Sequence, residues 1–130
     1  VERLREGQGM EVAVACRFEP LRIEADQALP LSLILNEVVS NAFKHAFPDG
    51  RPGRIDVTLA VRPGDAVLTV EDDGVGMAQA GRVGMGSRLI RRLAAQLGAS
   101  IETRGGRGTT FVLTFPLGDA SLRDLQPQAA

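Results

Sequence analysis

The 130-residue chain has one cysteine, one histidine and no tryptophan. Because Cys16 has no second cysteine to pair with, a disulfide within the chain is excluded, and its alternating apolar surroundings predict a buried, reduced thiol. No apolar run approaches the roughly 20 residues of a membrane-spanning helix, and we see no signal peptide, so we expect a cytoplasmic protein without direct membrane contact. The formal net charge of −1 argues against a nucleic-acid partner, which requires a basic surface.

The length suits a single domain, and the hydrophobic pattern divides it into helices and strands. One helix is predicted over residues 29–47, with Pro30 in its first turn and Asp26 as its cap, and a second over 87–97, ended by Gly98. Strands are predicted over residues 11–18, 21–24, 54–62, 66–72, 100–104 and 109–115, with Pro63-Gly-Asp65 as a hairpin turn.

This order of elements predicts an α+β fold. We expect a two-layer α/β sandwich with a mixed, mostly antiparallel sheet and the helices on one face. A ligand bound by residues of both helices would then lie on that face. Residues 1–10 are expected to be the end of an upstream linker or helix, residues 11–118 the folded domain, and residues 119–130 a flexible tail.

The polar side of the first predicted helix carries residues suited to phosphate and metal binding. Glu37 and Asn41 are four residues apart and share a helical face, which Lys44 and His45 extend by one turn. A carboxylate can act as a general base, an amide oxygen suits Mg²⁺, and a lysine offers a positive charge to phosphate oxygens. The same stripe is also typical of the solvated face of an ordinary amphipathic helix.

Two glycine-rich segments suggest a nucleotide site. The sequence Val70-Glu-Asp-Asp-Gly-Val-Gly-Met77 is a predicted strand that enters a glycine loop, and Gly84-x-Gly86 precedes the second helix. Glycines allow a ligand to approach the backbone closely, and the free N–H groups of a helix start attract phosphate. Asp72, at the end of the strand, can bind the edge of a base. Either segment alone could be an ordinary turn.

Four motifs occur together in a fixed order: Asn-Glu-x-x-x-Asn on a helix, Asp-x-Gly-x-Gly after a strand, Gly-x-Gly-x-x-Leu at a helix start, and Gly-Thr-x-Phe on a strand. With them, residues 26–116 resemble the catalytic ATP-binding domain of bacterial sensor histidine kinases. These belong to the GHKL ATPases, together with gyrase, mismatch-repair ATPases and the large heat-shock chaperone. The helix over 28–47 is similar to a sibling group of the HWE kinases, since His45 is present but tryptophan is absent.

The resemblance implies ATP and Mg²⁺ as ligands and assigns roles along the first helix. Asn41 matches the asparagine that ligates Mg²⁺ across the ATP phosphates. Glu37 matches the acid that accepts a proton from the nucleophile or orients it. Lys44 and His45 match positions near the phosphates.

The resemblance also assigns the base-binding residues. Asp72 matches the aspartate that accepts a hydrogen bond from the adenine amino group, and Thr109 matches a threonine that helps to hold a water beside that acid. The other implied positions are Gly74 and Gly76 under the adenine, and Gly84, Gly86 and Ser87 where the second helix begins near the phosphates.

Two features depart from the family pattern. Residues 77–83 are few for an ATP lid, so nucleotide should exchange readily unless a partner covers it. Asp73 stands where asparagine is common, and since a second carboxylate near phosphate would repel it, we expect Asp73 to point to solvent.

The only histidine lies on the nucleotide helix, so a phosphoacceptor histidine must lie on another segment, expected to be an upstream helical hairpin. The implied partners are this dimerisation and phosphoacceptor domain of the same protein and a downstream response regulator. Alone, the chain would then be inactive in autophosphorylation. Two alternatives stay open: an anti-sigma-type protein serine kinase, and a degenerate docking or phosphotransfer module that has lost ATP.

Overall fold

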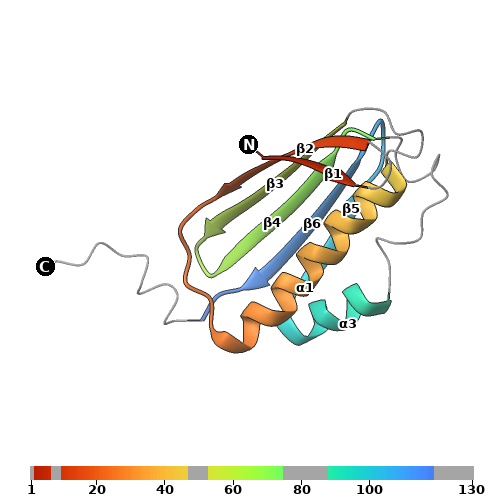
Figure 1. The fold of residues 1–130 in the computed structure, drawn as a ribbon. Coiled ribbons are helices and arrows are strands. Elements are labelled where there is room, and N and C mark those ends of the chain that lie inside the picture. The colour runs from red at the N-terminus through yellow and green to blue at the C-terminus, as the bar shows by residue number, and fades with distance from the viewer. Residues whose placement is uncertain (1, 7–9, 47–52, 75–87, 119–130) are drawn as a thin grey trace, which may run out of the picture.

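The alternating apolar residues of the chain form one six-stranded sheet (Figure 1). The structure, a computed structural model, describes residues 2–6, 10–46, 53–74 and 88–118. The strands are β1 (Glu2–Glu6), β2 (Met10–Phe18), β3 (Gly53–Arg62), β4 (Asp65–Asp72), β5 (Ser100–Arg104) and β6 (Thr109–Pro116). Their spatial order is β1-β2-β3-β4-β6-β5, and among these described strands β2 and β3 pair in parallel while every other neighbouring pair is antiparallel.

Two helices cover one face of this sheet. They are α1 (Ala25–Asn41), continued by the π-helical turn η1 (Ala42–Ala46), and α3 (Arg88–Leu97). Figure 1 shows both on the same side of the strands. The predicted two-layer α+β sandwich is therefore confirmed. No helix in the described ranges is both long and apolar enough to cross a bilayer.

The core is built from every second strand residue and one stripe of each helix. In β4, for example, Ala66, Leu68, Val70 and Asp72 are buried while the residues between them are not. The largest fully buried apolar side chains are Ile34 of α1, Ile90 of α3, Ile55 of β3, and Phe111, Leu113 and Phe115 of β6. The alternation means that the opposite face of the sheet meets solvent, as expected for one-sided helix cover.

Three predictions for the N-terminal part are wrong. Residues 2–6 form a strand paired with β2 and not the end of a helix, and residues 21–24 have no regular structure. Cys16 is exposed, although Val12 and Val14 on the same face of β2 are buried. The side-chain layer that covers those valines does not reach the second half of the strand, where Phe18 is also exposed. Alternation in a sequence predicts a face but not how far its cover extends.

The first helix begins four residues earlier than predicted, and its cap is Glu24, not Asp26. The Glu24 N–H donates to Oε1 of Gln27 at 3.2 Å, and the Gln27 N–H donates to the Glu24 carbonyl at 2.9 Å. These bonds satisfy N–H groups that a helix start leaves open. The Gln27 side chain also donates to the Pro116 carbonyl at 3.0 Å, which ties the helix start to the end of β6. Pro30 therefore lies inside the helix and is buried.

The second helix ends as predicted. Gly98 has φ +65, its N–H donates to the Ala95 carbonyl, and the Ala99 N–H donates to the Ala94 carbonyl. This pattern is a Schellman motif, for which glycine is favoured. Ile90, Leu93, Ala94 and Leu97 of this helix are buried, whereas Leu89 is 48% exposed.

The helix-to-sheet core should dominate stability. We expect Ile34→Ala, at a fully buried position of α1, to lower the free energy of unfolding by about 2–5 kcal/mol because it leaves a cavity. Leu29→Ala is the control, since Leu29 lies on the same helix but is 65% exposed, and it should change stability by less than about 0.5 kcal/mol. Urea unfolding followed by circular dichroism measures both. Equal losses would show that α1 does not pack as described.

Candidate functional site

Three buried side chains in the described part of the chain are polar or charged. Asn41, Asp72 and Thr109 are 7%, 5% and 1% exposed, and they come from α1, β4 and β6. All three were predicted as site residues. Burying a polar group without partners costs about 1–3 kcal/mol, and an unpaired charge costs more. Because polar groups are costly to bury, the place where these three side chains are buried defines the candidate site.

The ends of three elements bring these side chains to one end of the molecule. Asp72 is the last residue of β4 and lies directly opposite Thr109, the first residue of β6. Figure 1 shows the C-terminal end of α1 at the same end of the sheet. Asp72 and Thr109 lie on the same face of their strands as the buried core residues, so both point into the layer between sheet and helices. Asn41 is buried from the helix side of that layer.

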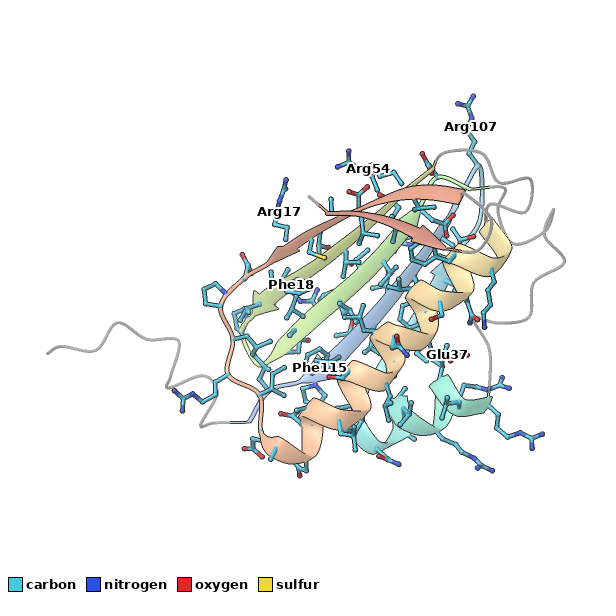
Figure 2. The ribbon with its side chains drawn as sticks, in the orientation of Figure 1. Arg17, Phe18, Glu37, Arg54, Arg107 and Phe115 are labelled. Atoms are coloured by element: carbon cyan, nitrogen blue, oxygen red, sulfur yellow. The ribbon has the colours of Figure 1, made fainter. Side chains whose placement is uncertain are left out.

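Asn41 was predicted on the polar, solvated side of the helix, and that placement is wrong. It is buried together with Ile34 and Val38 of the same helix. Glu37 is half-buried, and Figure 2 shows it on the side of α1 that is turned toward α3. The regular α-helix also ends here: residues 42–46 form a π-helical turn that carries Lys44, whose side chain is exposed. Short π-helical segments are frequent at functional sites, and nothing in the sequence indicated this one.

The Asp72 carboxylate is held by its own loop. Its Oδ1 accepts a hydrogen bond from the buried N–H of Gly74 at 3.0 Å, which closes an Asx turn as the chain leaves β4. This bond fixes the side chain in the buried layer while the backbone turns away. Gly74 was predicted as a site residue for its lack of a side chain, and the structure adds its N–H as a donor to the acid.

Asp73 is exposed, as predicted, but it does more than point to solvent. Its Oδ1 accepts a hydrogen bond from the backbone N–H of Arg54 at 2.8 Å, and its own N–H donates to the Arg54 carbonyl at 3.2 Å. The residue that follows Asp72 therefore ties the end of β4 to the beginning of β3.

Gly108 lies against the candidate site, although the sequence analysis gave it no role. A Cβ at this position would overlap the backbone carbonyl oxygen of Asp72 and lie 2.9 Å from its carbonyl carbon and 3.2 Å from the Cα of Asp73. The turn before β6 thus lies directly on the backbone of the buried acid. The available signal was the Gly-Thr-x-Phe motif, in which only the threonine was given a role.

A hollow of about 380 Å³ borders the same strand ends from the other face of the sheet. Most of the residues that line it are charged: Arg54, Asp56, Glu71, Asp72, Asp73 and Arg107. Gly105, Gly108 and Thr110 complete the lining. Figure 2 shows Arg54 and Arg107 on the side away from the helices. Because the buried Asn41, Asp72 and Thr109 side chains lie on the helix side, we place the candidate site there and not in this hollow.

Comparison with known proteins identifies the family of the chain. The family model for histidine kinase-, DNA gyrase B- and HSP90-like ATPases matches residues 26–119. The chain belongs to this ATPase family. ATP is accordingly the nucleotide that the site is expected to take.

Within this family, the chain is similar to histidine kinases and to an anti-sigma factor. The chain is 33% identical over 118 residues to a blue-light-activated histidine kinase of Erythrobacter litoralis, covering 86% of this chain and 34% of that protein. A solved structure of a blue-light activated histidine kinase from the same species has a TM-score of 0.76 at 31% identity, covering 85% of this chain and 36% of that one. The chain thus spans about a third of the length of these kinases. An anti-sigma F factor of Geobacillus thermodenitrificans is 25% identical, with 78% of each chain covered.

Several predicted positions lie outside the described residues. Gly76, Gly84, Gly86 and Ser87 fall within 75–87, as does the predicted short lid, and the predicted tail falls within 119–130. His45 lies in η1, but its side chain is likewise outside the described set. These assignments stay predictions.

The contact at Gly108 gives a test of how the acid is supported. We expect Gly108→Ala to weaken ATP binding at least about tenfold, because the added methyl group must displace the backbone that carries Asp72, a strain that also costs stability on the scale of 1–3 kcal/mol. Gly105→Ala is the matched control in the same turn, since a Cβ there meets nothing within 4 Å and its φ is not in the left-handed region. Calorimetric titration with ATP, on variants shown to be folded by melting, measures the effect. Equal affinities for the two variants would contradict it.

Proposed function

We propose that this chain is the Mg-ATP-binding catalytic domain of a two-component sensor histidine kinase, of the sibling group of the HWE kinases. The observation that carries the proposal is the burial of Asn41, Asp72 and Thr109 at one end of the layer between helices and sheet. Membership in the ATPase family and the similarity to histidine kinases support it. We assign the ATP-binding unit to residues 11–118.

Base recognition is assigned to the end of β4. The Asp72 carboxylate, held by the Gly74 N–H, would accept a hydrogen bond from the adenine amino group. Guanine carries a carbonyl oxygen at the equivalent position, and an anionic acceptor repels it. Thr109 lies opposite Asp72 and would hold a water beside it. Gly74 and Gly76 would form the floor under the base.

Phosphate binding is assigned to the end of α1 and the start of α3. Asn41 would be the protein ligand of Mg²⁺, and Lys44, His45, Gly84, Gly86 and Ser87 would lie near the phosphates. Among the described residues, no group of three or more His, Cys, Asp or Glu side chains gathers at one point. A single amide oxygen from the protein fits Mg²⁺, which keeps several waters and takes phosphate oxygens as ligands. When bound, the ion would neutralise charge on the phosphates.

The chemical step would require little from this chain beyond positioning and proton transfer. Glu37, half-buried on the α3 side of α1, would accept or orient the proton of the attacking imidazole. That imidazole would lie on a dimerisation segment of the same protein, since the only histidine here belongs to η1. We therefore propose that the chain alone does not autophosphorylate, and that it acts in the cytoplasm upstream of a response regulator.

A protein serine kinase of the anti-sigma type is the second candidate. Its support is the anti-sigma F factor that the chain matches over 78% of both lengths, whereas the histidine kinase is matched over a third of its length. The identity to that factor is lower, 25% against 33%. The two functions differ in the acceptor residue, not in the ATP site.

Asp72→Ala tests the base assignment. Loss of a hydrogen bond to a charged acceptor costs about 1.5–3 kcal/mol, so ADP should bind roughly ten- to a hundredfold more weakly and the preference for ADP over GDP should fall. Asp65→Ala, at the opposite end of the same strand, is the control and should leave both quantities unchanged. Magnesium-free calorimetry measures them. Unchanged selectivity in Asp72→Ala would refute the assignment.

Glu37→Gln tests the proton-transfer role. With the full-length kinase, we expect ATP affinity within about twofold of wild type and phosphoryl transfer slowed by roughly 10²–10⁴, the usual contribution of a general base. Glu102→Gln, at an exposed position of β5, is the control and should transfer normally. Labelled phosphate on the product should be acid-labile, as in phosphohistidine, and acid-stable label would favour the serine kinase. Weak ATP binding with normal transfer would remove Glu37 from its role.

A further inference from the structure

The hydrogen-bond ladder between β3 and β4 ends in an unusual way. From the hairpin at Pro63 and Gly64, the register pairs Arg62 with Asp65 and then, every second step, reaches Asp56 with Glu71. In an antiparallel pair, directly opposed residues exchange both hydrogen bonds at every second position. The next such pair would be Arg54 with Asp73, one residue beyond the end of β4.

Half of this terminal pair is made by a side chain. The Asp73 N–H donates to the Arg54 carbonyl at 3.2 Å, as a regular ladder requires. The Arg54 N–H, however, donates at 2.8 Å to the carboxylate of Asp73. The carboxylate takes the place of a main-chain carbonyl, so the backbone can leave the sheet immediately after Asp72 while the Arg54 N–H stays bonded. A charged acceptor makes this bond stronger than an ordinary ladder bond.

Asp72 is therefore fixed from both neighbouring strands. On the β3 side, the following residue is bonded twice to Arg54. On the β6 side, Gly108 lies directly on the Asp72 carbonyl, where a side chain could not fit. The Asx turn, in which the Gly74 N–H donates to the Asp72 carboxylate, follows directly after this fixed backbone. A shift of the backbone at Asp73 would move both the buried acid and the donor that orients it.

We propose that Asp73 is a positioning residue of the nucleotide site, whose carboxylate clamps the end of β4 to Arg54 and so aims the Asp72 carboxylate at the base. The inference rests on the proposed function of Asp72. Asp73 acts through the backbone: it is exposed and lines the hollow on the opposite face of the sheet, away from the buried site. The Arg54 guanidinium is paired with Asp56 at 2.9 Å, and the clamp uses only the Arg54 main chain.

Three variants separate this role from its alternatives. Asp73→Ala removes the acceptor. Asp73→Asn keeps an acceptor oxygen in the same place without the charge. Arg54→Ala keeps the backbone N–H and removes the guanidinium. Dissociation constants for ADP and GDP, measured by calorimetry without Mg²⁺ and well below each melting temperature, report base recognition independently of phosphoryl transfer.

With the clamp as described, Asp73→Ala should weaken ADP binding by about tenfold and lower the GDP-to-ADP ratio of dissociation constants by a similar factor. Asp73→Asn and Arg54→Ala should each stay within about threefold of wild type in both quantities. A merely structural loss would lower the melting temperature without changing the selectivity ratio, and that result would overturn the proposal.

Other results also overturn it and identify the reason. Wild-type behaviour of Asp73→Ala would show that the clamp is dispensable. If Asp73→Asn were as impaired as Asp73→Ala, the charge and not the hydrogen bond would matter. If Arg54→Ala were equally impaired, a side-chain ion pair would be responsible. The titrations are repeated with Mg²⁺, and a loss of affinity in Asp73→Ala seen only then would make Asp73 a metal ligand. Wild-type protein that binds no ADP would instead refute the proposed function itself.

Discussion

The structure of the candidate site depends on how the buried carboxylate of Asp72 is held in place. Asp72 is 5% exposed, and a buried charge is tolerated only where fixed donors replace the water it has lost. The donor here is the backbone N–H of Gly74, which is fixed only as firmly as the backbone that carries it. The end of β4 is accordingly bonded to β3 through Asp73 and lies against β6 through Gly108, and the turn that follows it donates the Gly74 N–H to the acid.

The two-layer fold supplies the rigidity that this arrangement needs. The central strands β3, β4 and β6 bury their inward residues against α1 and α3, so the ends of those strands are held at one edge by a packed core. The helix start is joined to the end of β6 by Gln27, at the opposite edge. The buried polar residues therefore lie at the other end of both layers, away from this bond.

Much of this fold could be predicted from the sequence, because strands and helices have distinct periods. The hairpin at Pro63 and Gly64, the stop at Gly98 and strands β3 to β6 lie where the pattern indicated them. The errors arise where the hydrophobic pattern does not report the tertiary contacts that decide burial or the start of a helix. Alternation could not show that cover over β2 ends before Cys16, and a preference for proline in first turns hid the earlier start set by Glu24 and Gln27.

The residues of the candidate site likewise divide into those that the sequence could predict and those that it could not. The residues proposed to contact ATP, Asp72, Asn41 and Thr109, could be found from motifs, because a motif specifies the chemistry of a side chain. Residues that act through the backbone could not. At Gly108 a Cβ would overlap the Asp72 carbonyl oxygen. The Asp73 carboxylate accepts a hydrogen bond from the main-chain N–H of Arg54, nineteen positions away, which only the strand register reveals. On the first helix, Asn41 was predicted on the wrong face because a hydrophobic pattern assigns an amide side chain to the surface. In the structure Asn41 is buried on the same side of the helix as Ile34 and Val38, which restricts the orientation of its side chain. A polar side chain that the sequence pattern assigns to solvent but that the structure buries calls for a functional reason. Among the described residues, all three buried polar side chains occupy positions that the motifs had marked.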